Sequence, residues 1–154
     1  MNRMFAFVTR YSALGRYSSV QLSSSQGFRP FVRSMQAGIS KTEYEILSNE
    51  TLENYAEVFD KIGERYDLGS AYDVQHAYGV LKVTFGDRIG TYIINRQTPN
   101  KQLWLSSPLT GPKRYDYNPS RQEWIYKNDG TALHALLEKE ISEIVHDSIK
   151  FPKR

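Results

Sequence analysis

The sequence predicts an α+β fold: a two-layer α–β sandwich with N- and C-terminal helices on one face of a five- to six-stranded antiparallel sheet. Two observations support it. Apolar residues recur every three or four positions in two segments, near residues 42–65 and 133–145, as in amphipathic helices. Between these segments, apolar and polar residues alternate in short runs separated by turn residues, as in strands. Helices at both ends of a strand meander pack most economically on the same face of the sheet.

The first helix is expected from Thr42 to about Arg65. Thr42 and Glu45 have the spacing of a capping box, in which a threonine and a glutamate three residues later cap each other's backbone N–H groups. The apolar stripe of this helix is Leu52, Tyr55, Phe59, Ile62 and Tyr66. Glycines at 63 and 69 mark its end, and a short first strand is expected near 72–74.

Five further strands and a second helix are expected after Gly79. The strands are 80–85, 91–97, 101–106, 113–117 and 123–127. Turn residues connect them closely, which favours an antiparallel meander over helical crossovers. The second helix follows the turn at 128–130, and its stripe is Leu133, Leu136, Leu137, Ile141, Ile144 and Val145.

Alternation assigns the two faces of this sheet, because side chains two positions apart share a face. The face expected against the helices carries Leu81, Val83, Phe85, Tyr92, Ile94, Leu103 and Leu105. The opposite face carries Lys82, Thr84, Asn95, Gln97, Gln102, Trp104 and Ser106. Trp104 is therefore expected to be exposed to water.

An exposed tryptophan among amides and cations is typical of a protein-binding surface. Residues 88–127 support this reading, because they contain seven Lys or Arg residues and two acids. The alternative is a tryptophan covered by a loop or packed on a neighbouring strand.

A row of carboxylates forms a second candidate surface, on the first helix. Its members step by three and four residues and fall within an arc of about 80° opposite the apolar stripe. They are Glu50, Glu53, Glu57, Asp60 and Glu64. Asp67 and Asp73 extend the row beyond the helix. Carboxylate oxygens in such a row predict weak binding of several hard cations. The alternative is that the row is only the solvated face of an amphipathic helix.

Other chemistries find little support in the sequence. The chain has no cysteine, and its three histidines lack the spacing of a metal motif. No nucleophile elbow or phosphate-binding glycine loop is present, so no catalytic residue and no organic cofactor are expected. No apolar run reaches the roughly 18 residues that cross a membrane, so no membrane insertion is expected.

The first 42 residues contain no Asp or Glu but six Lys or Arg residues and eight serines. This composition predicts an organellar targeting presequence over 1–41, the alternative being a disordered tail. The expected domain is 42–150, with a C-terminal tail at 151–154. Residues 43–154 hold 14 cations and 17 acids, a net charge of −3, so the basic character belongs to the presequence. Nucleic-acid binding loses its main support.

The segment GTYIINRQTPNKQLWLSSPLTGPKRYD, residues 90–116, resembles the frataxin family of mitochondrial iron–sulfur assembly proteins. Supporting segments are LENYAEVFDKI at 52–62, YDV at 72–74, GVLKV at 79–83 and DGTALHALLEKEI at 129–141. The resemblance covers about 42–147. It implies a protein of the mitochondrial matrix that acts with a cysteine desulfurase and its iron–sulfur scaffold protein. In that complex it would speed sulfur transfer onto the scaffold.

The resemblance also implies roles for both surfaces. The family's sheet-face contacts correspond to Asn95, Gln97, Gln102, Trp104 and Arg114. Its acidic ridge corresponds to the carboxylate row and the following loop, and is associated with weak binding of ferrous and ferric iron and with docking to a basic surface of the desulfurase. The ridge is thinner here, because Lys61 and Ala71 stand where the family often has acids.

Three candidate functions agree with these two surfaces and with the family resemblance. The first is a regulatory protein that activates the desulfurase complex, the second a ferroxidase, and the third an iron chaperone or store. Open carboxylate rows without an enclosed pocket are poor preorganised catalysts, which favours the first. A monomer is expected, with iron-dependent oligomers as the alternative.

Overall fold

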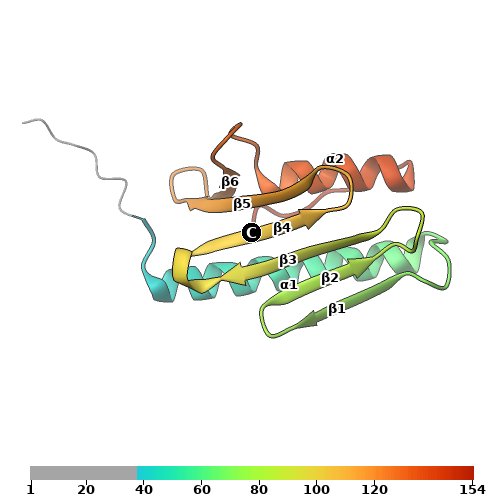
Figure 1. The fold of residues 1–154 in the computed structure, drawn as a ribbon, viewed down its shortest axis with the longest axis horizontal. Coiled ribbons are helices and arrows are strands. Elements are labelled where there is room, and N and C mark those ends of the chain that lie inside the picture. Colours follow the sequence, from blue (N-terminus) through green and yellow to red (C-terminus); the bar gives the residue numbers. More distant parts are fainter. Residues whose placement is uncertain (1–37) are drawn as a thin grey trace, which may run out of the picture. The chain divides into compact units, whose positions relative to one another are not determined.

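The computed structural model describes residues 38–154, which form two helices behind one sheet in the view of Figure 1. The elements are α1 (Lys41–Arg65), β1 (Asp73–Ala77), β2 (Val80–Thr84), β3 (Thr91–Gln97), the 3₁₀ turn η1 (Thr98–Asn100), β4 (Gln102–Ser107), β5 (Gly111–Asn118), β6 (Glu123–Tyr126) and α2 (Leu133–Val145). The six strands follow in chain order and every neighbouring pair is antiparallel. The predicted α+β sandwich is confirmed. The presequence prediction lies almost entirely outside the described residues.

The start of α1 corrects the predicted capping box. Ser40, not Thr42, is the N-cap: its hydroxyl accepts from the N–H of Glu43 at 3.1 Å, and the Glu43 carboxylate accepts from the N–H of Ser40 at 2.8 Å. The reason is tertiary. Contacts with distant residues fix the chain on both sides of Ser40: the carbonyl of Ile39 accepts from Lys101 at 2.7 Å, and the buried Tyr44 donates through its hydroxyl to the carbonyl of Gln102 at 2.9 Å.

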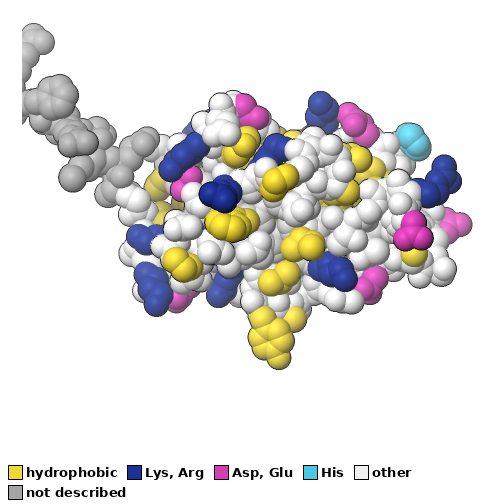
Figure 2. All heavy atoms as spheres, in the orientation of Figure 1, with side chains coloured by type: hydrophobic (Ala, Val, Ile, Leu, Met, Phe, Trp, Pro, Cys, Tyr) yellow, Lys and Arg dark blue, Asp and Glu magenta, His cyan; other side chains and the backbone are white. Residues whose placement is uncertain are grey.

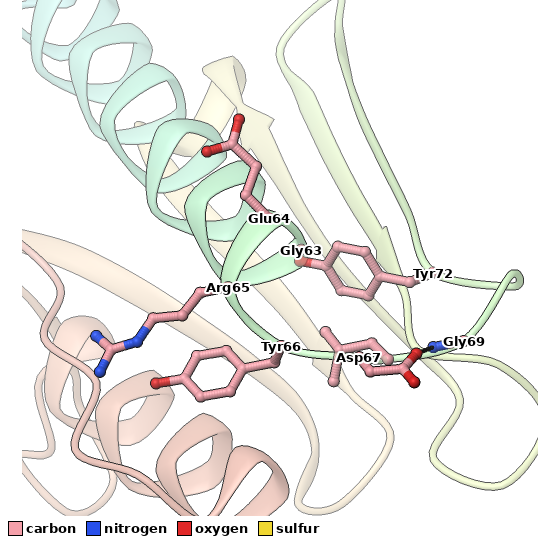
Figure 3. Close-up of a pocket in the computed structure, with 8 residues that line it drawn as sticks. Gly63, Glu64, Arg65, Tyr66, Asp67, Gly69 and Tyr72 are labelled. Carbon is pink, nitrogen blue, oxygen red and sulfur yellow. Dashed lines mark hydrogen bonds between the residues drawn. The ribbon is translucent and has the colours of Figure 1, made fainter.

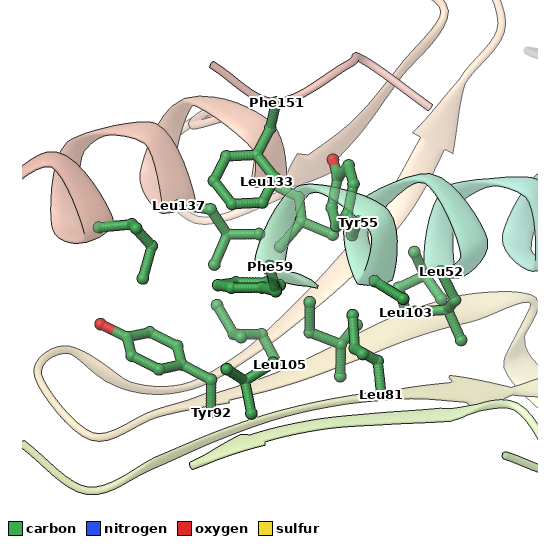
Figure 4. Packing of buried hydrophobic residues seen from close by; sticks show 14 of the residues in the cluster. Leu52, Tyr55, Phe59, Leu81, Tyr92, Leu103, Leu105, Leu133, Leu137 and Phe151 are labelled. Atoms are coloured by element: carbon green, nitrogen blue, oxygen red, sulfur yellow. The ribbon is translucent and has the colours of Figure 1, made fainter. Parts of the chain in front are cut away.

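The predicted division of the sheet into two faces is confirmed on the helix side. All seven residues assigned there are 5% exposed or less: Leu81, Val83, Phe85, Tyr92, Ile94, Leu103 and Leu105. Figure 4 shows Phe59 of α1 between these side chains and those of α2. Each large side chain buried in this way contributes roughly 1.5–3 kcal/mol to folding.

The strand at one end of the sheet is longer than predicted, and the chain's last residues join the core. Strand β1 extends to Ala77, because it pairs with β2 from Asp73 opposite Thr84 to Ala77 opposite Val80. Phe151, in the segment expected to be a tail, is 4% exposed. Its ring lies 5.2 Å from that of Tyr55 and 5.1 Å from that of Phe59. Among the described residues, neither α-helix is long and apolar enough to cross a membrane.

Candidate partner-binding surface

The face of the sheet turned away from the helices carries all five residues predicted to bind a partner. Trp104 lies opposite Asn95 on β3 and opposite Arg114 on β5. Gln97 and Gln102 form the next facing pair, between β3 and β4. The structure therefore brings Asn95, Gln97, Gln102, Trp104 and Arg114 together on three adjacent strands.

Trp104 is half-buried rather than freely exposed, which corrects the prediction. The guanidinium carbon of Arg114 lies 4.4 Å from the centroid of its ring, within the range of a cation–π contact. Its indole N–H donates to the side-chain oxygen of Gln102 at 3.0 Å. These two contacts come from strands and not from a loop: Arg114 lies on the neighbouring strand β5, and Gln102 lies on β4 itself. The ring is thus held in one orientation on an otherwise open face.

The amide of Gln102 is also held in place. Its Nε2 donates to Oδ1 of Asp116 at 3.1 Å, while its oxygen accepts from Trp104. Asp116 in turn pairs with Lys127 at 3.2 Å. A chain of contacts therefore runs from Lys127 to Trp104, and it fixes polar groups before any partner arrives, which lowers the entropic cost of binding.

A pocket beside this chain was not predicted from the sequence. Its lining includes three cations, Lys113, Arg114 and Lys127, together with Asp116 and Tyr126. The family resemblance, not the alternation of residues, pointed to Arg114, and the contribution of Lys127 depends on β6 lying beside β5. The pocket adds positive charge to one end of the partner-binding surface.

The predicted carboxylate row lies on the exposed side of α1. Glu50, Glu53, Glu57, Asp60 and Glu64 are all exposed. Two of them have local partners: Glu53 accepts from Asn49 at 2.6 Å, and Glu57 lies 3.8 Å from Lys61. Near the end of the row, burial raises the pKa of the Tyr72 hydroxyl, and the negative charge of Asp60 raises it further.

The two acids expected to extend the row are engaged elsewhere. Asp67 accepts from the N–H of Gly69 at 3.3 Å, and Asp73 accepts from Gln75 at 2.7 Å. Figure 3 shows a pocket at the end of α1 in which the carboxylates of Glu64 and Asp67 point in different directions. These two groups are not arranged to share an ion.

The row does not fit a preformed iron site. Among the described residues, no group of three or more Asp, Glu or His side chains is placed to hold one metal ion. Rigid helical spacing instead offers carboxylates singly or in pairs, with water as the remaining ligands.

The protein-family model that describes the frataxin-like domain matches residues 37–147 of this chain. A mitochondrial frataxin of Caenorhabditis elegans is 45% identical over 108 residues, 70% of this chain and 79% of the worm protein. A mitochondrial frataxin homologue of Drosophila melanogaster is 46% identical over 104 residues, 66% of this chain and 55% of the fly protein.

A solved structure of trimeric frataxin from Saccharomyces cerevisiae, complexed with ferrous iron, superposes with a TM-score of 0.53 at 32% identity. The match covers 66% of this chain and 87% of the yeast one. The fold is an α–β sandwich, with two helices on one face of a six-stranded antiparallel sheet and the candidate partner-binding residues on the other face. The chain belongs to the frataxin family.

Proposed function

We propose that this protein is an iron-binding activator of mitochondrial iron–sulfur cluster assembly. It binds the complex of a cysteine desulfurase and its scaffold protein, and it promotes sulfur transfer onto the scaffold. Family membership supports the reaction and the compartment, since the relatives are named mitochondrial frataxins. The observation that carries the proposal is the contact between Trp104 on β4 and Arg114 on the neighbouring strand β5, on the open face of the sheet.

Trp104 has the features of an interface anchor in this proposal. It is a large aromatic side chain with its indole N–H already satisfied by Gln102, so burial under a partner leaves no unpaired donor. Around it lie amides that can bond a partner's backbone, and Arg114 supplies charge. Trp and Arg are the residue types that contribute most to binding at such centres.

The carboxylate row supplies a second contact in the same complex. Its carboxylates are all exposed on α1 and point away from the sheet. Their negative charge is complementary to a basic surface on the desulfurase. Iron binds there weakly, through one or two carboxylates at a time.

Cluster assembly with purified desulfurase and scaffold tests the proposal, with the full chain as wild type and as Trp104→Ala. Stimulation by the wild type and its loss in the variant are expected. Circular dichroism confirms folding, which the variant should retain because Trp104 lies outside the core. Equal stimulation by both proteins would remove the sheet face from the mechanism.

Iron handling, as a ferroxidase or as an oligomeric chaperone, is the second candidate. The observation that favours it is the yeast relative solved as a trimer with ferrous iron. On this alternative, Trp104→Ala oxidises Fe²⁺ and assembles as the wild type does, whereas loss of Glu53, Glu57 and Asp60 together impairs both. The absence of any stimulation by the wild type would favour this candidate.

A further inference from the structure

Tyr78 occupies the tip of the β1–β2 hairpin and is fully exposed, with a relative accessibility of 104%. The pairing of Ala77 with Val80 leaves Tyr78 and Gly79 as a two-residue turn. Both have positive φ, 52° and 76°. Turns of this kind favour Asn, Asp or Gly at the first position, because a bulky side chain is strained there.

The strain at Tyr78 has no compensation within the described domain. Its hydroxyl has no hydrogen-bond partner among residues 38–154, and full exposure means that its ring packs on nothing. The turn itself is held firmly, because the N–H of Arg96 donates to the carbonyl of Gly79 at 2.9 Å. A large aromatic side chain is thus presented on a fixed support.

Two more apolar side chains connect this tip to the partner-binding surface. Val80 and Ile93 are 38% and 36% exposed on the same outward face. Val80 lies opposite Asn95, which lies opposite Trp104. Figure 2 shows hydrophobic side chains on this face and one that projects beyond the β1–β2 turn.

We infer that Tyr78, Val80 and Ile93 form a second anchor for the partner bound through Trp104, the scaffold protein, which receives Tyr78 in an apolar pocket. The inference rests on the proposed function. In the proposed function the carboxylate row on α1 contacts the desulfurase, which leaves the scaffold as the partner of the outward sheet face. The patch continues that face, so a protein bound over Trp104 and Asn95 also reaches Val80.

Positive charge is distributed unevenly over this surface. Its β5–β6 end carries Arg114 and Lys127, whereas on the outward face of β2 and β3 only Lys82 is charged. A complementary partner is therefore acidic at one end and apolar at the other. It can dock in one orientation only, with its apolar pocket over the β1–β2 hairpin.

Substitution Tyr78→Asn in the full chain tests the inference without risk to folding, because asparagine suits the turn better than tyrosine. We expect affinity for the purified desulfurase–scaffold complex to fall about tenfold, as for an interface anchor. The thermal midpoint is expected to stay equal or rise. Tyr78→Phe should bind as the wild type does. Leu109→Asn is the matched control, because Leu109 is 52% exposed in the turn between β4 and β5 and belongs neither to the patch nor to the carboxylate row.

Two further measurements separate a failure of this inference from a failure of the proposed function. One is the affinity of Trp104→Ala for the complex, and the other is the affinity of Tyr78→Asn for the desulfurase alone. If Trp104→Ala loses affinity and Tyr78→Asn does not, the hairpin anchor is wrong and the proposed function stands. If both variants bind as the wild type does, both ideas fail. Weaker binding of Tyr78→Asn to the desulfurase alone would overturn the choice of the scaffold. A change in sedimentation with unchanged affinity would assign the patch to a contact between copies of this chain.

Discussion

Arg114 lies directly opposite Trp104 on the neighbouring strand, with its guanidinium carbon 4.4 Å from the centroid of the indole ring. This contact sets the orientation of the tryptophan on an open sheet face. A planar guanidinium stacks on an aromatic ring, whereas the ammonium of a lysine is a compact charge on a flexible stem. The arginine is therefore suited to hold the ring, and its replacement tests whether that orientation matters.

Arg114→Lys is expected to weaken stimulation of cluster assembly although it keeps the charge. The reason is the loss of the stacked geometry around Trp104. A double-mutant cycle of Trp104→Ala and Arg114→Ala, read in the free energy of unfolding, should give a coupling of about 0.5–1 kcal/mol. Full stimulation by Arg114→Lys would show that charge alone is needed.

Ser40→Ala is expected to lower the free energy of unfolding by about 0.5–2 kcal/mol, because Ser40 caps α1. Thr42→Ala is the control: Thr42 lies in the first turn and is exposed, so its removal should change stability little. Urea unfolding measures both. A larger effect of Thr42→Ala would restore the capping box predicted from the sequence.

Glu140→Ala is expected to cost about 1–3 kcal/mol for each hydroxyl left unpaired, partly offset by relaxation. The carboxylate of Glu140 is 3% exposed and accepts from the hydroxyls of Tyr92 at 2.8 Å, Ser107 at 2.6 Å and Thr110 at 2.6 Å. It thereby ties α2 to β3 and to the β4–β5 turn. Glu143→Ala, at an exposed position of the same helix, is the control in urea unfolding. An equal effect of both substitutions would show that the hydroxyl cluster adds nothing.

Tyr66→Phe tests a pH dependence with a defined sign. The Tyr66 hydroxyl donates to Asp147 at 2.6 Å and lowers the pKa of Asp147, with help from the N–H of Ser148 and from Arg65. The same bond raises the pKa of Tyr66. The contribution of Asp147 is present above its unfolded pKa of about 3.9 and is lost as pH falls through the lower folded value. The contribution of Tyr66 is present below about pH 10 and is lost as pH rises through its higher folded value.

Thermal midpoints should therefore differ most between wild type and Tyr66→Phe from about pH 5 to pH 9, and should converge in acid and in alkali. Tyr78→Phe is the control, because the exposed Tyr78 hydroxyl has no partner among the described residues. A difference in thermal midpoint that stays constant across pH would contradict this prediction, because it would show that Tyr66 acts on stability independently of the titration of Asp147 and Tyr66.

Iron binding to the α1 row should weaken as salt rises, because screened and solvated carboxylates supply it. Calorimetry with Fe²⁺ under anaerobic conditions, at low and high ionic strength, measures this. Substituting Glu53, Glu57 and Asp60 by their amides should reduce binding while leaving the fold intact, since all three are exposed. An affinity unchanged by salt would point to an enclosed site.

The sequence by itself determined the order of the elements and the sides of the sheet. A period of two along 80–106 placed Leu81 and Leu103 in the core and Asn95 and Gln102 outside, because strand geometry alone relates neighbouring side chains. The same alternation put Asn95, Gln97, Gln102 and Trp104 on the outward face, whereas Arg114 was added only by the family resemblance. The row of acids on α1 needed only the pitch of a helix.

Tertiary structure decided what depends on contacts between distant residues. Ser40 and Thr42 both have a glutamate three positions later, so the local pattern does not choose between them. In the folded chain the cap is Ser40, where Ile39 and Tyr44 on either side bond to Lys101 and Gln102. Trp104 is covered because register places Arg114 across from it, 10 residues along the chain, and local pattern does not fix register. Tyr78 lies in a tight turn because β1 runs to Ala77, which only its pairing with β2 establishes.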